Sequence, residues 1–210
     1  MKKTHFADDA AQFWDKRFSK DEYVFGKDPN AYLKDQVTSR IKPGGNALCI
    51  ADGEGRNSVW LAQQGMIVEA FDISPVAVEK ARQLAKHQLV SVALNVASTD
   101  SWTWKLNHYD LIAAIFIQFA TPNMRVDLFA HIRQSLKPGG YLILQGYTPK
   151  QLEYKTGGPP SIDHLYTTEL IQDLLRGMEI CDWQEYEAEI HEGEGHRGMS
   201  ALMGVVARKL

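Results

Sequence analysis

Apolar and polar residues follow two different patterns along the chain from residue 46 onward. Short apolar runs that end in turn residues alternate with longer stretches in which apolar side chains recur every three or four positions, as at Ala77, Ala81 and Leu84. The first pattern is typical of buried strands and the second of amphipathic helices. We therefore expect five strands, over residues 47–51, 67–71, 90–96, 109–116 and 141–147.

The order of these elements predicts the fold class. Strands that alternate with helices form a parallel sheet with helices on both faces. Near the end of the chain, Tyr186, Ala188 and Ile190 alternate with glutamates, as in a half-exposed strand, and an apolar run follows over residues 201–207. These two segments are expected to form an antiparallel C-terminal hairpin, which completes a mostly parallel, seven-stranded α/β sheet.

Turn and cap residues place the helix boundaries. Ser74 and Pro75 are typical of an N-cap and a first helical turn. A later helix is expected over residues 129–136, broken by the Lys-Pro-Gly-Gly sequence at residues 137–140.

Residues 1–45 precede this alternation and are predicted to form two helices. Three aromatic side chains recur there at near-helical spacing: Phe13, Trp14 and Phe18. The Asp-Pro-Asn sequence at residues 28–30 marks the start of the second helix. No repeat or linker divides the chain. We expect a single domain over residues 1–210, with a helical lid over 1–45 and a core over 46–210.

Composition narrows the class of protein. The chain has 210 residues and a formal net charge of -3, which argues against nucleic-acid binding because such proteins present a basic face. Cys49 and Cys181 lie too far apart for a disulfide framework, as is usual in a reducing cytoplasm. Asp8 and Asp9 interrupt any signal-peptide core, and no apolar run reaches membrane-spanning length. A soluble, cytoplasmic protein with no membrane partner is expected.

A glycine-rich turn and an acidic residue indicate a nucleoside site. The turn at residues 51–55 follows the first strand, and glycine lets the backbone approach a ligand closely. Asp72 ends the second strand, where a carboxylate can accept hydrogen bonds from two ribose hydroxyls. Both features also have a purely structural interpretation. In it, the glycines serve only the turn itself, and Asp72 is a helix-capping or turn residue. Together they favour a nucleoside-containing cofactor.

The details of the turn bear on which cofactor binds. A dinucleotide fingerprint places Gly or Ala where this chain has Ser58. A nicotinamide-dependent oxidoreductase is therefore the weaker alternative, and a non-catalytic cofactor-binding protein is a further one.

Several motifs carry a resemblance to a known family. Residues 50–57, 71–75 and 136–140 resemble the successive motifs of class I S-adenosylmethionine-dependent methyltransferases. Residues 25–30 and 157–159, with the His-Arg-Gly sequence at 196–198, resemble the tellurite-resistance methyltransferase subgroup. The resemblance covers nearly the whole chain. It implies a Rossmann-like fold, S-adenosylmethionine as cofactor, and methyl transfer to a small molecule such as a chalcogen oxyanion or a thiol.

The resemblance also implies the cofactor-binding residues, which are Ala51, Gly53, Gly55, Asn57, Asp72, Ile73, Ser98 and Phe116. Asp100 is the alternative to Ser98 as the acceptor for the adenine amino group. The chain departs from the family at Cys49, where an acidic residue is usual, and at Ala51, where glycine is usual. We expect weaker cofactor binding for this reason, with Asp52 or water partly compensating.

Residues for the acceptor are expected in the loops at the same edge of the sheet. The loops at residues 117–122 and 148–166, together with Trp14 and Phe25 of the lid, are candidates for its walls. In the final hairpin loop, His196 and Arg197 are the predicted catalytic pair, placed to bind an anionic acceptor. The alternative is a solvated polar turn.

A metal site in the same hairpin loop is not expected. The loop offers four possible ligands, His191, Glu192, Glu194 and His196. Its two histidines are five positions apart with glycines between them, unlike the spacing in HExxH zinc sites.

Overall fold

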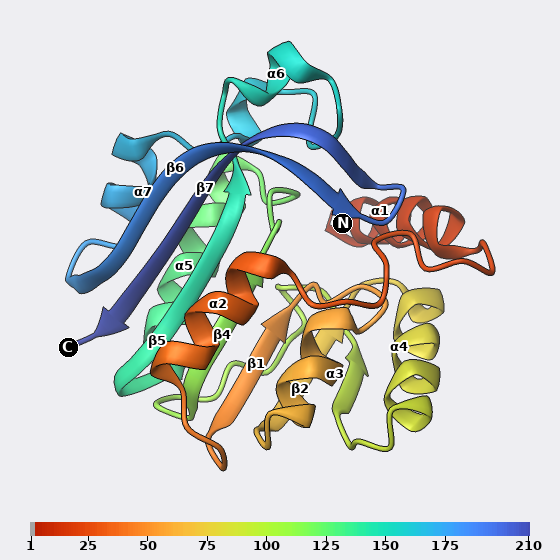
Figure 1. The fold of residues 1–210 in the computed structure, drawn as a ribbon, viewed down its shortest axis with the longest axis horizontal. Helices are drawn as coiled ribbons and strands as arrows, with labels where there is room; N and C mark the ends of the chain where they lie inside the picture. The colour runs from red at the N-terminus through yellow and green to blue at the C-terminus, as the bar shows by residue number, and fades with distance from the viewer. Residues whose placement is uncertain (1–2) are drawn as a thin grey trace.

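A seven-stranded sheet forms the centre of the molecule, in the order β3-β2-β1-β4-β5-β7-β6 (Figure 1). The computed structural model describes residues 3–210, so the first two residues of the expected lid and the side chain of Asp8 lie outside the description. The strands are β1 (Asn46–Ile50), β2 (Ile67–Asp72), β3 (Ala93–Val96), β4 (Tyr109–Ile115), β5 (Leu136–Tyr147), β6 (Met178–Glu192) and β7 (His196–Lys209). β1 to β5 are parallel, and β7 is antiparallel to both β5 and β6. The predicted fold class is confirmed.

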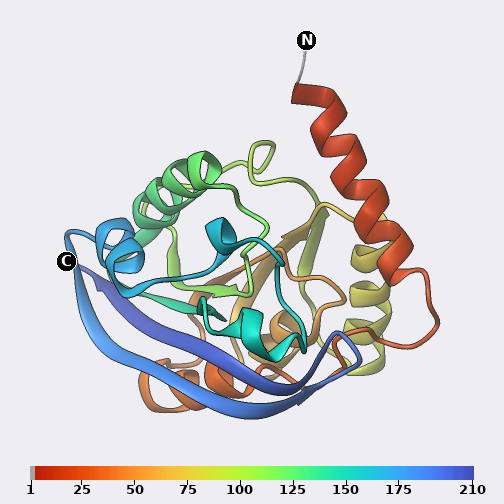
Figure 2. The same cartoon turned by 90° about the horizontal axis from the view of Figure 1, so that it is seen from above.

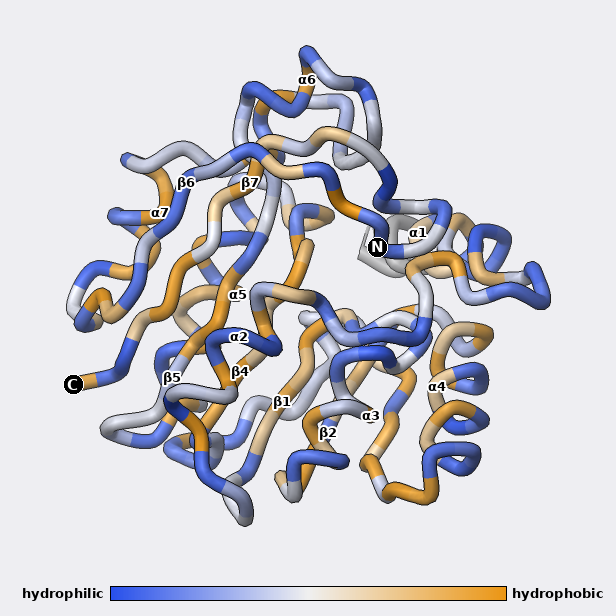
Figure 3. Tube along the Cα trace, viewed as in Figure 1, coloured by the Kyte–Doolittle hydropathy of each residue, from blue (hydrophilic) through white to orange (hydrophobic). Residues whose placement is uncertain are grey.

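Helices cover both faces of the sheet. They are α1 (Lys3–Phe18), α2 (Ala31–Arg40), α3 (Arg56–Gln63), α4 (Pro75–His87), α5 (Pro122–Ser135), α6 (Gln151–Tyr154) and α7 (Thr168–Leu174). In Figure 1, α2 and α3 lie in front of the sheet, and α5 and α7 lie behind it. Successive residues of β1 serve opposite faces: Leu48 packs in the cluster of Phe129 of α5, and Cys49 in the cluster of Leu61 of α3. Hydrophobic residues accordingly concentrate along the central strands (Figure 3).

The predicted helix starts are confirmed at α4 and α2. The Ser74 hydroxyl accepts a hydrogen bond from the backbone N–H of Ala77 at 3.1 Å, and Pro75 occupies the first turn. The side chain of Asn30 accepts from the N–H of Leu33 at 2.9 Å. These side chains satisfy N–H groups that have no partner within the helix.

The boundary between α5 and β5 was predicted wrongly. Leu136 is not the end of a helix but the first residue of β5, and residues 137–140 belong to the strand. The strand pairs Leu136 with Tyr109, then shifts register before Leu111. Gly140 permits this shift, because a Cβ there would lie 2.9 Å from the carbonyl oxygen of Tyr109.

Other segments also differ from the prediction. His196 and Arg197 begin β7 and do not lie in the hairpin loop, because the strand pairing of β6 with β7 extends to Glu192 and His196. β3 begins at Ala93 rather than residue 90, because the N–H of Val90 still bonds to the carbonyl oxygen of Ala85 beyond the end of α4. The expected loop at 148–166 contains α6 and a 3-10 turn, Ile162–His164. α7 was not anticipated, although Thr167 caps it with a side-chain hydrogen bond to the N–H of Leu170.

Two elements reach the edge of the sheet where the parallel strands end. β6 is parallel to β1–β5, so the turn between β6 and β7 lies at their carboxyl ends. α1 packs on α4, and it projects away from the body of the molecule (Figure 2). None of the helices within residues 3–210 combines the length and hydrophobicity needed to cross a membrane.

Candidate functional site

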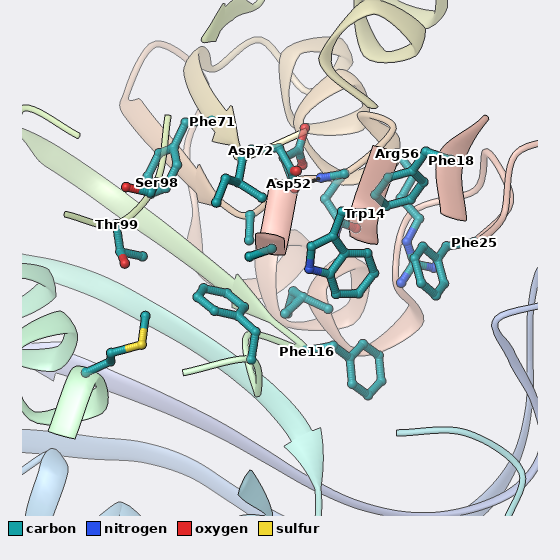
Figure 4. A pocket seen from close by; sticks show the side chains of 18 of the residues that line it. Trp14, Phe18, Phe25, Asp52, Arg56, Phe71, Asp72, Ser98, Thr99 and Phe116 are labelled. Carbon is teal, nitrogen blue, oxygen red and sulfur yellow. Dashed lines mark hydrogen bonds between the residues drawn. The ribbon is translucent and has the colours of Figure 1, made fainter. Parts of the chain in front are cut away.

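A cavity of about 420 Å³ lies between the carboxyl ends of the parallel strands and α1 (Figure 4). Open α/β sheets bind ligands at this edge, and the volume is in the range of small-molecule sites. Its walls come from the lid, the glycine turn, the strand ends and the hairpin: Ala10, Trp14, Phe18, Phe25, Ala51, Asp52, Gly53, Arg56, Asn57, Phe71, Asp72, Ile73, Ser98, Thr99, Asp100, Ile115, Phe116, Phe119, Met124 and His196.

Most of the predicted site residues meet in this cavity. Its walls include Ala51, Gly53, Asn57, Asp72, Ile73, Ser98, Phe116 and His196. They do not include Gly55 or Arg197.

The glycine turn has a left-handed backbone at three positions, which are Ala51, Gly53 and Gly55, with φ of +48°, +61° and +91°. At Ala51 this conformation is one that favours glycine. Gly53 exposes bare backbone to the cavity. At Gly55, a Cβ would lie 2.7 Å from the Cβ of Ala81, so the absent side chain serves the packing of α3 on α4.

Asp72 is buried at the end of β2, with its carboxylate held by the backbone. One oxygen accepts from the N–H of Gly53 and the other from the N–H of Ser74, both at 2.9 Å. Burial raises the pKa of Asp72 to about 6, against the opposing effect of these donors. Each oxygen keeps a lone pair, so the carboxylate can still accept from hydroxyl groups of a ligand.

Asp52 brings a second carboxylate into the same part of the cavity (Figure 4). It accepts from the hydroxyl of Ser58 and, at 3.3 Å, from the N–H of Ser58. Burial raises the pKa of Asp52 to about 6 as well. Cys49, by contrast, is outside the cavity wall, and burial raises the pKa of its thiol. The thiol therefore stays neutral and offers no charge to a cofactor.

The other predicted cofactor residues lie around these carboxylates. The side chain of Asn57 accepts from the N–H of Asn30 at 2.9 Å, which ties the start of α2 to α3. Ser98 and Asp100 both line the cavity, so the choice between them as the adenine acceptor stays open. Phe116 has a φ of +55° just after β4, a strained backbone of the kind that gathers at functional sites.

Aromatic rings from the lid form one wall of the cavity, for which the sequence predicted Trp14 and Phe25. Trp14 and Phe18 stack with ring centroids 5.6 Å apart, and Phe18 meets Phe25 edge-on at 6.0 Å. The guanidinium of Arg17 lies 5.5 Å from the ring centroid of Trp14 and 5.3 Å from that of Phe25. The lid therefore presents an apolar, aromatic surface to the cavity.

The predicted pair, His196 and Arg197, lies on β7 with its two side chains on opposite sides of the strand. His196 is buried in the cavity wall, with its ring centroid 4.2 Å from that of Phe116 and 4.5 Å from that of Phe25. Arg197 is exposed and does not line the cavity, because consecutive residues of a strand point to opposite faces. In this structure the two side chains therefore do not share one cavity wall.

A buried ion pair supports His196 and was missed by the sequence analysis. Arg56 donates from Nη2 to Glu192 at 2.7 Å, and Nδ1 of His196 lies 3.7 Å from the same carboxylate. Burial opposes ionisation of Glu192, but His196 and Arg56 outweigh it and lower the pKa of Glu192 to about 2. Burial, partly offset by Glu192, lowers the pKa of His196. The imidazole is thus neutral at neutral pH.

These partners left only a partial signal in the sequence. Arg56 stands directly after the glycine turn, at the start of α3, which could have identified it. The sequence marks Glu192 only as a possible metal ligand. Thr99, Phe119 and Met124 also line the cavity, and nothing in the local pattern distinguishes them from ordinary loop and helix residues.

The four candidate metal ligands of the hairpin do not gather at one point, although Glu192 and His196 face each other. His191 and Glu194 are exposed, while His196 is buried in the cavity wall. Within residues 3–210 no cluster of three or more His, Cys, Asp or Glu side chains has the arrangement of a metal site.

The donor set of the cavity fits S-adenosylmethionine. Asp72 can accept from ribose hydroxyls, and the bare backbone at Gly53 admits close approach. The methionine end carries an ammonium and a carboxylate, for which Asp52 and Arg56 provide opposite charges in the cavity wall. The sulfonium needs no anion of its own, and an aromatic surface attracts cations.

Comparisons with known proteins agree with this fit. Residues 47–140 match the sequence model of a family described as methyltransferase domain. The chain is 26% identical over 206 residues to thiopurine S-methyltransferase of Vibrio vulnificus, which covers 90% of this chain and 93% of that protein. It is 32% identical over 126 residues to thiocyanate methyltransferase 1 of Brassica oleracea, which covers 59% and 54%.

A solved structure shares the fold. TehB of Haemophilus influenzae superposes with a TM-score of 0.70 at 16% identity, covering 95% of this chain and 67% of that one. The relation supports the resemblance to the tellurite-resistance subgroup at the level of fold.

Proposed function

We propose that this chain, which is a class I S-adenosylmethionine-dependent methyltransferase, transfers the methyl group to a small, uncharged thiol. The observation that carries the proposal is the buried ring of His196, set among aromatic rings in the cavity wall, while Arg197 is exposed outside it. An acceptor that enters without charge and loses a proton at the site suits such a wall.

The charges around the cavity favour a neutral acceptor over an oxyanion. Asp52, Asp72 and Asp100 place carboxylates in the wall. Arg56 is paired with Glu192 and is assigned to the cofactor carboxylate, so it is not available to an anionic acceptor. An oxyanion would have to shed its hydration beside these carboxylates, which costs free energy.

The proposed roles follow from position. Asp72 binds the ribose hydroxyls, Gly53 gives backbone access, and Ile73 with Ser98 or Asp100 surrounds the adenine. Ala51, Asn57 and Phe116 complete the cofactor side of the wall. In this proposal Gly55 acts indirectly, by letting α3 and α4 pack behind the turn.

The acceptor side aligns the thiol and excludes water. Bound S-adenosylmethionine supplies an electrophilic methyl group on a positively charged sulfur. Nδ1 of His196 is shielded beside Glu192, which leaves Nε2 to take the proton from the thiol. Trp14, Phe25 and Phe116 surround the same space and keep water from competing.

Two other features support the proposal. One of the relatives named above is a thiopurine S-methyltransferase, whose acceptor atom is sulfur. The cavity draws its walls from the lid and from the core, so we also propose that residues 1–45 and 46–210 act as one functional unit.

Calorimetric titration tests the cofactor side. Saturable binding of S-adenosylmethionine is expected, with none of NAD. Asp72→Ala should weaken the binding by roughly 10- to 100-fold, the usual cost of losing hydrogen bonds to a charged group. The absence of any binding would mean that Cys49 has cost the site its cofactor and that the chain is a non-catalytic relative.

A panel of acceptors tests the thiol. Aromatic and heterocyclic thiols are compared with tellurite, selenite and iodide, and S-adenosylhomocysteine formation is measured. Faster turnover of thiols than of the inorganic ions is expected. Preferential methylation of an oxyanion would contradict the proposed acceptor class while leaving the cofactor assignment intact.

A further inference from the structure

Glu54 lies in the middle of the glycine turn but does not line the cavity. It is 3% exposed, which is unusual for a carboxylate unless it is paired. Its neighbours Asp52 and Gly53 face the cavity, so Glu54 connects the cofactor turn to whatever it contacts on the other side.

The contacts of Glu54 lie in the lid. Oε2 accepts from the N–H of Val24 at 2.7 Å and from the N–H of Phe25 at 3.5 Å. Oε1 forms an ion pair with Lys80 of α4. The carboxylate thus binds the backbone just where Phe25 enters the cavity wall.

Lys80 holds the same segment from the other side. Its Nζ donates to the carbonyl oxygens of Lys20 at 2.8 Å, Glu22 at 2.7 Å and, more weakly, Phe18 at 3.4 Å. In return, the hydroxyl of Tyr23 donates to the carbonyl oxygen of Lys80 at 3.0 Å, and its ring lies 4.9 Å from Nζ. The buried pair therefore binds the lid backbone from residue 18 to residue 25.

This segment attaches α1, the outer part of the lid, to the body of the molecule. α1 projects from the body of the molecule and joins it at its carboxyl-terminal end (Figure 2). α1 also makes polar contacts with the core through Asp15, which accepts from the hydroxyl of Ser74 and, at 3.4 Å, from the N–H of Val76. Trp14 and Phe18 are carried on the last turns of α1, directly before the segment that Glu54 and Lys80 hold.

We propose that Glu54 is a positioning residue, and that the Glu54–Lys80 pair is a latch that holds the aromatic lid over the cofactor turn. Because the carboxylate belongs to the turn itself, the lid and the turn move as one. A ligand that orders the turn then also tightens the lid, and a ligand can leave only when these contacts open.

Limited proteolysis of the ligand-free chain tests the latch. Trypsin can cut the lid after Lys16, Arg17 and Lys20. In Glu54→Gln, cleavage at these sites should be at least tenfold faster than in the unchanged protein, because the charge that holds Lys80 is lost. Lys80→Gln provides a second variant in case the first folds poorly. The control is Glu79→Gln, which removes an exposed carboxylate from the adjacent position on α4.

Two further readouts separate positioning from general destabilisation. In the unchanged protein S-adenosylhomocysteine should slow lid cleavage, and in Glu54→Gln this protection should be largely lost while its dissociation rate rises about tenfold. The double variant should behave as either single one, since the two residues act together.

The proposal is overturned if lid cleavage in both variants matches Glu79→Gln. It is equally overturned if cleavage accelerates uniformly along the chain, since that would show ordinary unfolding. The ligand-free measurement does not depend on the proposed function, so a chain that binds no cofactor would still test the latch.

Discussion

The residue that most directly links ionisation to ligand binding is Asp72. Burial disfavours the charged form of its carboxylate more than the backbone hydrogen bonds favour that form, so its pKa is raised to about 6. The ionised form is the one that accepts hydrogen bonds from two hydroxyl groups. Asp52, which lines the same cavity, has its pKa raised to about 6 for the same reason. Protons and ligand therefore compete for both residues.

The affinity for S-adenosylmethionine should depend on pH accordingly. Both carboxyls bind a proton below about pH 6, so affinity is expected to be level above pH 7 and to fall below 6 by about tenfold per unit for each carboxyl involved. Calorimetry between pH 5 and 8 measures this. Asp72→Asn should weaken binding at every pH and reduce the slope by about one proton. A slope unchanged in that variant would assign the pH dependence to another group.

His196 gives a second residue-scale prediction. Since burial lowers its pKa, the imidazole is a neutral base at neutral pH. His196→Gln is expected to lower kcat for a weakly acidic thiol by about 100-fold or more, the usual contribution of a general base. The effect should shrink for thiols that are already ionised at the assay pH.

His191→Gln is the matched control for this prediction, because His191 is exposed in the same hairpin. Its kinetics should stay within twofold of the unchanged protein. Equal losses for acidic and weakly acidic thiols in His196→Gln would point to a packing role for the ring instead.

Among the elements, the packing of α3 on α4 places the glycine turn. The two helices meet at Gly55 and Ala81, where there is no room for a Cβ. The turn in front of α3 then presents Gly53 to the cavity and Glu54 to the lid. A change at Gly55 should therefore act through stability first and through the site second.

Gly55→Ala tests this, because the alanine would have to adopt a φ of +91° and would place its Cβ 2.7 Å from that of Ala81. We expect the free energy of unfolding to fall by about 2–4 kcal/mol. Gly44→Ala is the matched control, because Gly44 has a φ of +88° but no atom within 4 Å of its added Cβ. That variant should lose only about 1 kcal/mol. Equal losses in the two denaturation curves would show that strain, not packing, determines the cost.

At the scale of the whole molecule, the site depends on contacts between distant parts of the chain. Glu192 accepts from Arg56 at 2.7 Å and from the side chain of Asn30 at 2.9 Å, which joins the hairpin to α3 and α2. At the tip of the hairpin, the N–H of Gly195 donates to the carbonyl oxygen of Val24 at 3.0 Å. The lid is thus enclosed between the glycine turn and the hairpin, and the cavity exists only when all three are assembled.

The sequence by itself determined the fold class, the caps of α2 and α4, and the two features at the ligand edge, the glycine turn and Asp72. These follow from short-range physics: periodicity reports burial, and turns and caps need particular residues. The predicted element boundaries were wrong where the local sequence signals were weak, as at Leu136, where α5 passes directly into β5.

Only the tertiary structure decided which side chains share the cavity. Strand alternation turned His196 inward and Arg197 outward, and close helix packing explained Gly55. Arg56 with Glu192, and Glu54 with Lys80, are pairs separated by long stretches of chain, so no local pattern could join them. Their partners are chosen by the register of the sheet and the docking of the lid, because burial allows these charges only where an opposite charge is brought within reach.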